Sequence, residues 1–305
     1  MFHGTKCKIY SQDSDESSDI GYLNFPALES GSYMFSKCRL DENYNTLLNF
    51  SGITPRCVNY YGMFAGSNIQ SFTNEDFFSG LVGEHHYDRT PLAKVREKLS
   101  GEALNSFAVT DTSKFACFDG MFSGCSNLTS FKGAAPDGIS AELVDFGIDC
   151  NYMFLGCSSL ANVQFSPNMM DNVRDVKGMF CGCSSLTEFK NSKHTKGGDT
   201  VGMTNVDSMF DSCSNLREVE LDMSYVTDYP NRTFYGCTAL TYFYGSLSSV
   251  ESTAEMFMDL NNLANVYTKL SSVVTGNYMF SGCTSLVTLN DINGRFGGYN
   301  SCYLP

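Results

Sequence analysis

The chain has 305 residues, of which 42% are hydrophobic and 17% are charged, and its formal net charge at pH 7 is −13. This composition is typical of a soluble, well-packed acidic protein and disfavours a disordered tail, a collagen-like rod and a membrane protein. The acidic excess repels phosphate backbones, and no Lys/Arg stripe with interleaved aromatic residues offsets it, so we expect no nucleic-acid partner. No apolar run approaches the roughly 18 residues of a transmembrane segment.

One phrase, Met-Phe-x-Gly-Cys-x-x-Leu, recurs along the chain. Its clearest copies occupy residues 121–128, 153–160 and 279–286, and looser copies begin at residues 34, 63, 179, 209, 233 and 256. The phenylalanine anchors stand at positions 2, 35, 64, 122, 154, 180, 210, 234, 257 and 280, so the steps are 33, 29, 58, 32, 26, 30, 24, 23 and 23 residues. Most of these steps are typical of leucine-rich repeats and their longer relatives. We interpret the 58-residue step as two coils, one of them degenerate or carrying an insertion.

A short stretch with the spacing Leu-x-x-apolar follows each copy of the phrase, as in residues 160–163, 216–219 and 286–289. Alternation in these stretches predicts strands with every second side chain pointing inward. One strand per coil, always in the same direction, can stack only as a parallel sheet on one face of a solenoid. The predicted fold is therefore a leucine-rich-repeat-like coil with one parallel β-sheet on the concave face and short helical or irregular segments on the convex side.

The repeat positions predict the core. Phenylalanine fills the coil interior, glycine allows a turn with positive φ, and the small cysteine packs against the next coil. The predicted core residues are Phe122, Cys125, Phe154, Cys157, Phe180, Cys183, Phe210, Cys213, Phe234, Cys237, Phe280 and Cys283. Together with Cys7 and Cys38, these cysteines form a ladder with one member per coil, which favours buried free thiols over disulfides or metal ligands.

The phrase resembles the BspA-like leucine-rich repeats, in the bacterial surface-protein branch whose coils read Met-Phe-x-Gly-Cys-Ser-Ser-Leu-Thr-x-Leu. Residues 157–160 and 183–187 match that wording almost letter for letter. The resemblance covers about residues 30 to 290 and is strongest from 119 to 290. It implies a right-handed leucine-rich solenoid with a role in surface adhesion or recognition, and it does not imply an enzyme.

We expect a single solenoid domain over residues 1–305. It would comprise divergent N-terminal coils (1–64), a degenerate coil with a helical insertion (65–118), regular repeats (119–290) and a C-terminal end (291–305). The inserted helix is predicted near 91–100, because a cap and Pro91 precede an apolar face and Gly101 follows it. Such a helix either covers the core or carries a partner contact.

Other polar clusters are weaker candidates for chemistry. His85, His86 and Asp88 lack the further ligands of a metal site, and the acidic run 11–19 lacks the glycine and final glutamate of an EF-hand. With four histidines and no catalytic motif, we expect no enzyme, no metal and no cofactor.

Function in a solenoid usually lies on its sheet face. The predicted ligand-binding residues there are Tyr242, Tyr244, Tyr267, Glu218, Glu220, Asp222, Asn162, Gln164 and Glu188. Tyrosines beside acids and amides suit protein or glycan surfaces, although aromatic rows can also simply stabilise adjacent strands.

The sequence therefore favours a recognition or adhesion protein at the cell surface or outside the cell, which binds a protein or glycan through the concave face. Residues 1–6 do not read as an export signal. The alternative is a structural or receptor-binding component of a phage virion or other large assembly, with end-to-end contacts through the solenoid termini.

Overall fold

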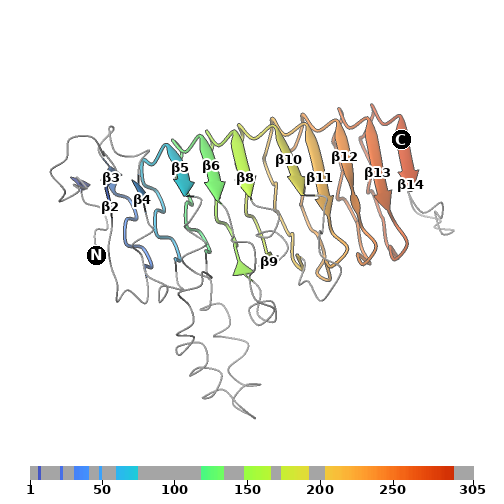
Figure 1. Cartoon of the computed structure of the whole chain (residues 1–305). Helices are drawn as coiled ribbons and strands as arrows, with labels where there is room; N and C mark the ends of the chain where they lie inside the picture. Colours follow the sequence, from blue (N-terminus) through green and yellow to red (C-terminus); the bar gives the residue numbers. More distant parts are fainter. Residues whose placement is uncertain are drawn as a thin grey trace, which may run out of the picture.

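The computed structural model describes residues 6–7, 21–22, 31–40, 48–49, 60–74, 118–133, 148–165, 173–191 and 203–291. These residues form a row of stacked coils, in which strands β5, β6, β8 and β10 to β14 lie side by side along one edge of the molecule, whereas β9 lies away from this edge (Figure 1). The strands in chain order are β1 (Lys6–Cys7), β2 (Gly21–Tyr22), β3 (Arg39–Leu40), β4 (Leu48–Asn49), β5 (Ser71–Asn74), β6 (Ser130–Gly133), β7 (Ile148–Asp149), β8 (Asn162–Phe165), β9 (Val173–Asp175), β10 (Glu188–Asn191), β11 (Glu218–Asp222), β12 (Tyr242–Ser246), β13 (Asn265–Lys269) and β14 (Thr288–Asp291). The predicted repeat solenoid is confirmed.

Every paired strand is parallel to its partner. The main sheet consists of a three-stranded part in the order β5-β6-β8 and a five-stranded part in the order β10-β11-β12-β13-β14. Three two-stranded pairs, β1-β3, β2-β4 and β7-β9, complete the strands of the described residues. No helix occurs within these ranges, and the wall opposite the sheet consists of turns.

This second wall, which we call the turn wall, consists of nine segments of equal length: 31–38, 60–67, 118–125, 150–157, 176–183, 206–213, 230–237, 253–260 and 276–283. In segment 150–157, the N–H groups of Met153, Leu155 and Cys157 donate to carbonyls three residues earlier. The N–H groups of Tyr152, Phe154 and Gly156 donate instead to the next coil, at distances of 2.7 to 2.9 Å. Alternate N–H groups therefore close local turns and join neighbouring coils, which satisfies the backbone without a helix.

Two residues in each turn-wall segment adopt positive φ, at its third and seventh positions. The glycine of the Met-Phe-x-Gly phrase occupies the seventh position, for example Gly156 with φ 71° and Gly182 with φ 77°. Glycine suits this position because it has no Cβ to clash with the following carbonyl oxygen.

The core is a column of phenylalanine rings, one from each turn-wall segment. Consecutive rings from Phe35 to Phe280 are nearly parallel, and their centroids lie 5.3 to 5.7 Å apart. Inward residues of the strands pack against this column; Phe131, Phe189 and Phe243 each contact two of its rings. All of the column's rings are buried.

One expectation about the coils is wrong. The ring of Phe64 stacks directly on that of Phe122 at 5.5 Å, and β5 pairs with β6. The 58-residue step is therefore one coil with additional residues rather than two coils, because no further coil lies between these neighbours. The helix predicted near 91–100 and most of the segment 65–118 lie outside the described residues.

Candidate functional site

The outward side chains of β10 to β14 form a surface that we call the sheet face. Parallel register places Glu218 opposite Tyr242, which lies opposite Asn265, and places Glu220 opposite Tyr244, which lies opposite Tyr267. The inward neighbours, such as Val219 and Phe243, are fully buried. The alternation expected from the sequence therefore holds on these strands, and it gathers six of the predicted residues on β11, β12 and β13.

Three tyrosines occupy the centre of the sheet face. The ring centroids of Tyr242 and Tyr267 lie 5.7 Å apart, and the two rings are inclined by 42°. Tyr244 lies two residues from Tyr242 on the same side of β12 and is 39% exposed. Partial burial, followed by the nearby carboxylate of Glu220, raises the pKa of Tyr242. The phenol therefore stays neutral and offers both a ring surface and a hydroxyl.

The acidic side chains flank these tyrosines. Glu218 and Glu220 lie on β11 directly opposite Tyr242 and Tyr244, and the Asp222 carboxylate accepts a 2.9 Å hydrogen bond from the Ser224 N–H. On the other side, Lys190 Nζ lies 2.8 Å from Glu188 Oε2 and 3.6 Å from Glu218 Oε2. This surface thus already holds an ammonium group of the chain itself between two carboxylates.

The other predicted ligand-binding residues lie farther along the solenoid. Asn162 and Gln164 are exposed on β8, which belongs to the three-stranded part of the sheet. Glu188 lies on β10, at the edge of the five-stranded part. The structure therefore brings together Glu218, Glu220, Asp222 and the three tyrosines, which we call the aromatic–acidic patch, and it does not bring Asn162 and Gln164 to it.

The predicted core phenylalanines and cysteines are all buried within the turn wall. Each of the six cysteine thiols donates to the carbonyl of the phenylalanine in the preceding coil, with Sγ···O distances of 2.9 to 3.2 Å. Burial raises the pKa of Cys125 and Cys283 to about 11 and raises those of the other four as well. The thiols therefore remain protonated donors, and Cys38, Cys150 and Cys181 are likewise thiols that form no disulfide.

Cys7 does not belong to this ladder, because the register of β1 with β3 places it opposite Leu40 rather than Cys38. Ser67 takes the ladder position in the coil of Phe64, and Leu260 takes it in the coil of Phe257. Cysteine is therefore the commonest residue at this position but not a required one.

The remaining candidates lie outside the described residues, namely the acidic run 11–19 and His85, His86 and Asp88. In the part of the chain that the structure describes, no three His, Cys, Asp or Glu side chains group as metal ligands. Within the same part, no helix has the length and apolar character required to cross a membrane.

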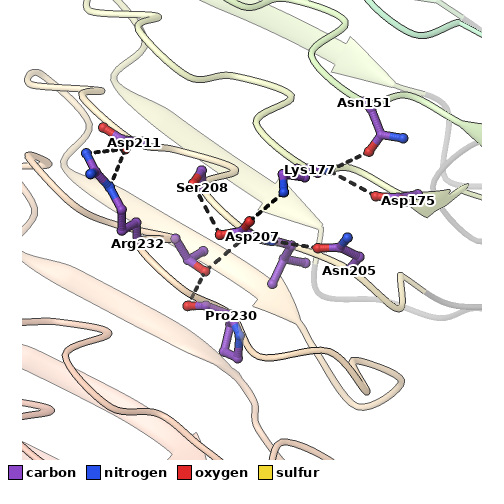
Figure 2. A network of polar contacts seen from close by, with 11 residues as sticks. Asn151, Asp175, Lys177, Asn205, Asp207, Ser208, Asp211, Pro230 and Arg232 are labelled. Atoms are coloured by element: carbon purple, nitrogen blue, oxygen red, sulfur yellow. Dashed lines mark hydrogen bonds and ion pairs between the residues drawn. The ribbon is translucent and has the colours of Figure 1, made fainter.

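A charged network on the turn wall was not anticipated from the sequence (Figure 2). Lys177 Nζ lies 3.0 Å from Asp207 Oδ2, and the Arg232 guanidinium contacts Asp211 Oδ2 at 2.8 and 2.9 Å. The guanidinium carbon of Arg232 also lies 4.1 Å from the ring centroid of Tyr235. These groups pair with one another across neighbouring coils, which favours a structural role for the network. The two residues of each ion pair are 21 or 30 residues apart in the sequence, so the pairing could not be predicted from it.

Two exposed tyrosines on the turn wall were also missed. A Cβ on Gly62 would lie 2.6 Å from the ring of Tyr33, and one on Gly178 would lie 2.5 Å from the ring of Tyr152. Each ring therefore covers a glycine of the following coil. The only sequence signal is the pairing of tyrosine with glycine at the same repeat position of successive coils.

Comparison with known proteins agrees with this repeat architecture. Residues 206–294 match the family described as "BspA type Leucine rich repeat region" in six copies, and residues 96–219 match the family described as "Mycoplasma protein of unknown function, DUF285". A search among curated proteins found no significant match.

Two solved structures are similar to parts of the chain. A leucine rich cell surface protein from Faecalibacterium prausnitzii A2-165 is 25% identical over 42% of this chain and 27% of its own chain, with a TM-score of 0.29. This chain therefore spans only about a quarter of that protein's length. A leucine-rich repeat protein from Bacteroides ovatus ATCC 8483 is 13% identical over 87% and 80% of the two chains, with a TM-score of 0.16. By its own coils the chain is a repeat protein, and residues 206–294 of it are similar to the BspA-type leucine-rich repeats.

Proposed function

We propose that this chain is a non-enzymatic recognition protein at a bacterial surface, and that it binds a protein or glycan partner through the sheet face. The surface location and the absence of catalysis are what the similarity to the BspA-type repeats implies. The observation that carries the binding role is the aromatic–acidic patch, in which three tyrosines and three carboxylates from three adjacent strands share one face.

The chemistry of this patch supports recognition. Tyrosine rings offer apolar area and a hydroxyl at a low cost in side-chain entropy, because only two torsions need to be fixed on binding. The rings also stand on a rigid sheet whose strands are paired on both sides, so little backbone has to be ordered when a partner docks.

The test is ligand capture on glycan and protein arrays, with the labelled chain compared with a variant carrying Tyr242→Ser, Tyr244→Ser and Tyr267→Ser. The matched control replaces Tyr152 and Tyr235 by serine, since both are exposed on the turn wall. We expect the sheet-face variant to lose capture and the control to retain it, with both keeping the circular dichroism spectrum of the parent. Capture that survives in the sheet-face variant and disappears in the control would place binding on the turn wall and refute the proposal.

A further inference from the structure

Resting on this proposed function, we propose that the aromatic–acidic patch recognises basic side chains, and that its partner is a protein segment rich in arginine or lysine. The partner would lie extended along β11, with its basic side chains seated between the carboxylates of Glu218 and Glu220 and the rings of Tyr242, Tyr244 and Tyr267.

The first argument is the combination of rings and carboxylates in register. An arginine or lysine head group is attracted both to the face of an aromatic ring and to a carboxylate. Glu220 and Tyr244 are direct partners across β11 and β12, and Tyr267 continues the same row on β13. Adjacent strands lie about 4.8 Å apart, so one basic head group spans a carboxylate and the neighbouring ring.

The second argument is an ammonium group that the sheet face already holds. Lys190 Nζ bonds to Glu188 Oε2 at 2.8 Å and lies 3.6 Å from Glu218 Oε2. All three side chains are about half exposed, with exposed fractions of 48%, 60% and 52%. Lys190 therefore makes the same kind of contact that we propose for a lysine or arginine of the partner, which would lie one strand away.

The third argument is periodicity. Glu218, Glu220 and Asp222 alternate along β11 and share its outward side, whereas Val219 and Leu221 point into the core. Side chains on one face of an extended chain repeat every two residues, which is about 6.6 to 6.8 Å. A partner strand with a basic residue at every second position therefore matches this row, and the net charge of −13 favours its approach.

This geometry also gives Lys190 a defined role as a competitor. Its ammonium group neutralises part of the charge of Glu218, so it opposes a basic ligand at the edge of the patch. Removal of this ammonium group should strengthen the capture of basic peptides, whereas it should weaken the capture of an anionic ligand.

The experiment measures the affinity of a labelled peptide in which arginine and threonine alternate, and of the same peptide with citrulline, which keeps the shape of arginine without its charge. We expect Tyr244→Phe to retain affinity within about twofold, since the ring remains, and Tyr244→Leu to lose about two- to fivefold. Glu220→Gln should lose a similar factor and Lys190→Gln should gain about two- to fivefold. The control Glu251→Gln removes one exposed charge outside the sheet face, and it should change the affinity by less than Glu220→Gln or Lys190→Gln does.

Three results would overturn the inference: equal affinity for the citrulline peptide, an equal loss from Glu251→Gln and Glu220→Gln, or no gain from Lys190→Gln. A neutral glycan whose capture depends on the three tyrosines, together with no binding of the arginine peptide, would refute this inference and leave the proposed function standing. If no array ligand depends on the sheet-face tyrosines, the proposed function itself fails.

Discussion

The positions with positive φ in each turn-wall segment lead to a prediction about stability. Substitutions at the same position of two different coils should change the free energy of unfolding in opposite directions. At the seventh turn-wall position, Gly182 has φ 77° and Lys37 has φ 54°. A non-glycine residue in this conformation costs roughly 1–2 kcal/mol, and glycine loses about 0.5–1 kcal/mol more backbone entropy on folding. The difference is about 0.5–1 kcal/mol, so Gly182→Ala should lower the free energy of unfolding by this amount and Lys37→Gly should raise it.

The surrounding atoms do not change this arithmetic at either site. A Cβ on Gly182 would lie 3.5 Å from the Cα of Gly156, which is an ordinary contact. The Lys37 side chain is exposed, and its Cγ lies 3.4 Å from the position that a Cβ on Gly66 would take, so its removal gives up little packing. Gly178→Ala should cost more than Gly182→Ala, because its new methyl group would meet the ring of Tyr152 at 2.5 Å.

The assay is thermal unfolding followed by circular dichroism and by tyrosine fluorescence, which 17 tyrosines and no tryptophan make the natural probe. For a chain of this length the expected shifts in Tm are about 1–3 °C, downward for Gly182→Ala and upward for Lys37→Gly. Shifts of the same sign for both substitutions would refute the argument that backbone conformation selects glycine in the Met-Phe-x-Gly phrase.

Two further predictions concern buried polar groups. Cys183→Ala should lower the free energy of unfolding in urea by about 1.5–2.5 kcal/mol, because it removes the thiol that donates to the Phe154 carbonyl and leaves unfilled volume. Cys183→Ser should cost less than half as much, since its hydroxyl can donate as the thiol does. An equal loss in both variants would contradict a role for the hydrogen bond. Burial, followed by the nearby carboxylates of Asp119 and Asp175, raises the pKa of Asp149 from 3.8 to about 6, so the folded state binds this proton more tightly than the unfolded chain. The stability that this proton contributes is complete below about pH 3.8 and is lost as pH rises through about 6. After allowance for solvent screening, we expect the free energy of unfolding to fall by about 1–2 kcal/mol over this range. If the free energy of unfolding of Asp149→Asn depends on pH as that of the parent does, the argument is refuted.

The repeat and its buried positions could be predicted because they depend on local period alone. A phrase that returns every 23 to 33 residues forces one strand per coil, and this period alone places Phe154 on Phe180 and Tyr244 beside Tyr267. The alternation of inward and outward residues on β11 to β13 follows from the pleat, so the members of the aromatic–acidic patch could be named without coordinates.

The features that could not be predicted depend on which coils become neighbours and on backbone conformation. The direct stacking of Phe64 on Phe122 could not be distinguished from an intervening degenerate coil, because the sequence distance of 58 residues fits either. The ion pairs of Lys177 with Asp207 and of Arg232 with Asp211 join residues whose types vary from coil to coil, so no period revealed them. The left-handed conformation of non-glycine residues such as Tyr152 likewise leaves no compositional signal.

The alternating hydrogen bonds of the turn wall make each coil an interchangeable part. A segment such as 150–157 offers three N–H donors to the coil after it and three carbonyl acceptors to the coil before it, and other segments repeat this arrangement. A whole coil can therefore be duplicated or deleted by recombination in the gene, and the coils on either side meet the same donors and acceptors as before. Because this joint uses so few residues, the chain between successive phenylalanines can vary from 23 to 58 residues. New surface loops can thus be acquired without redesign of the core.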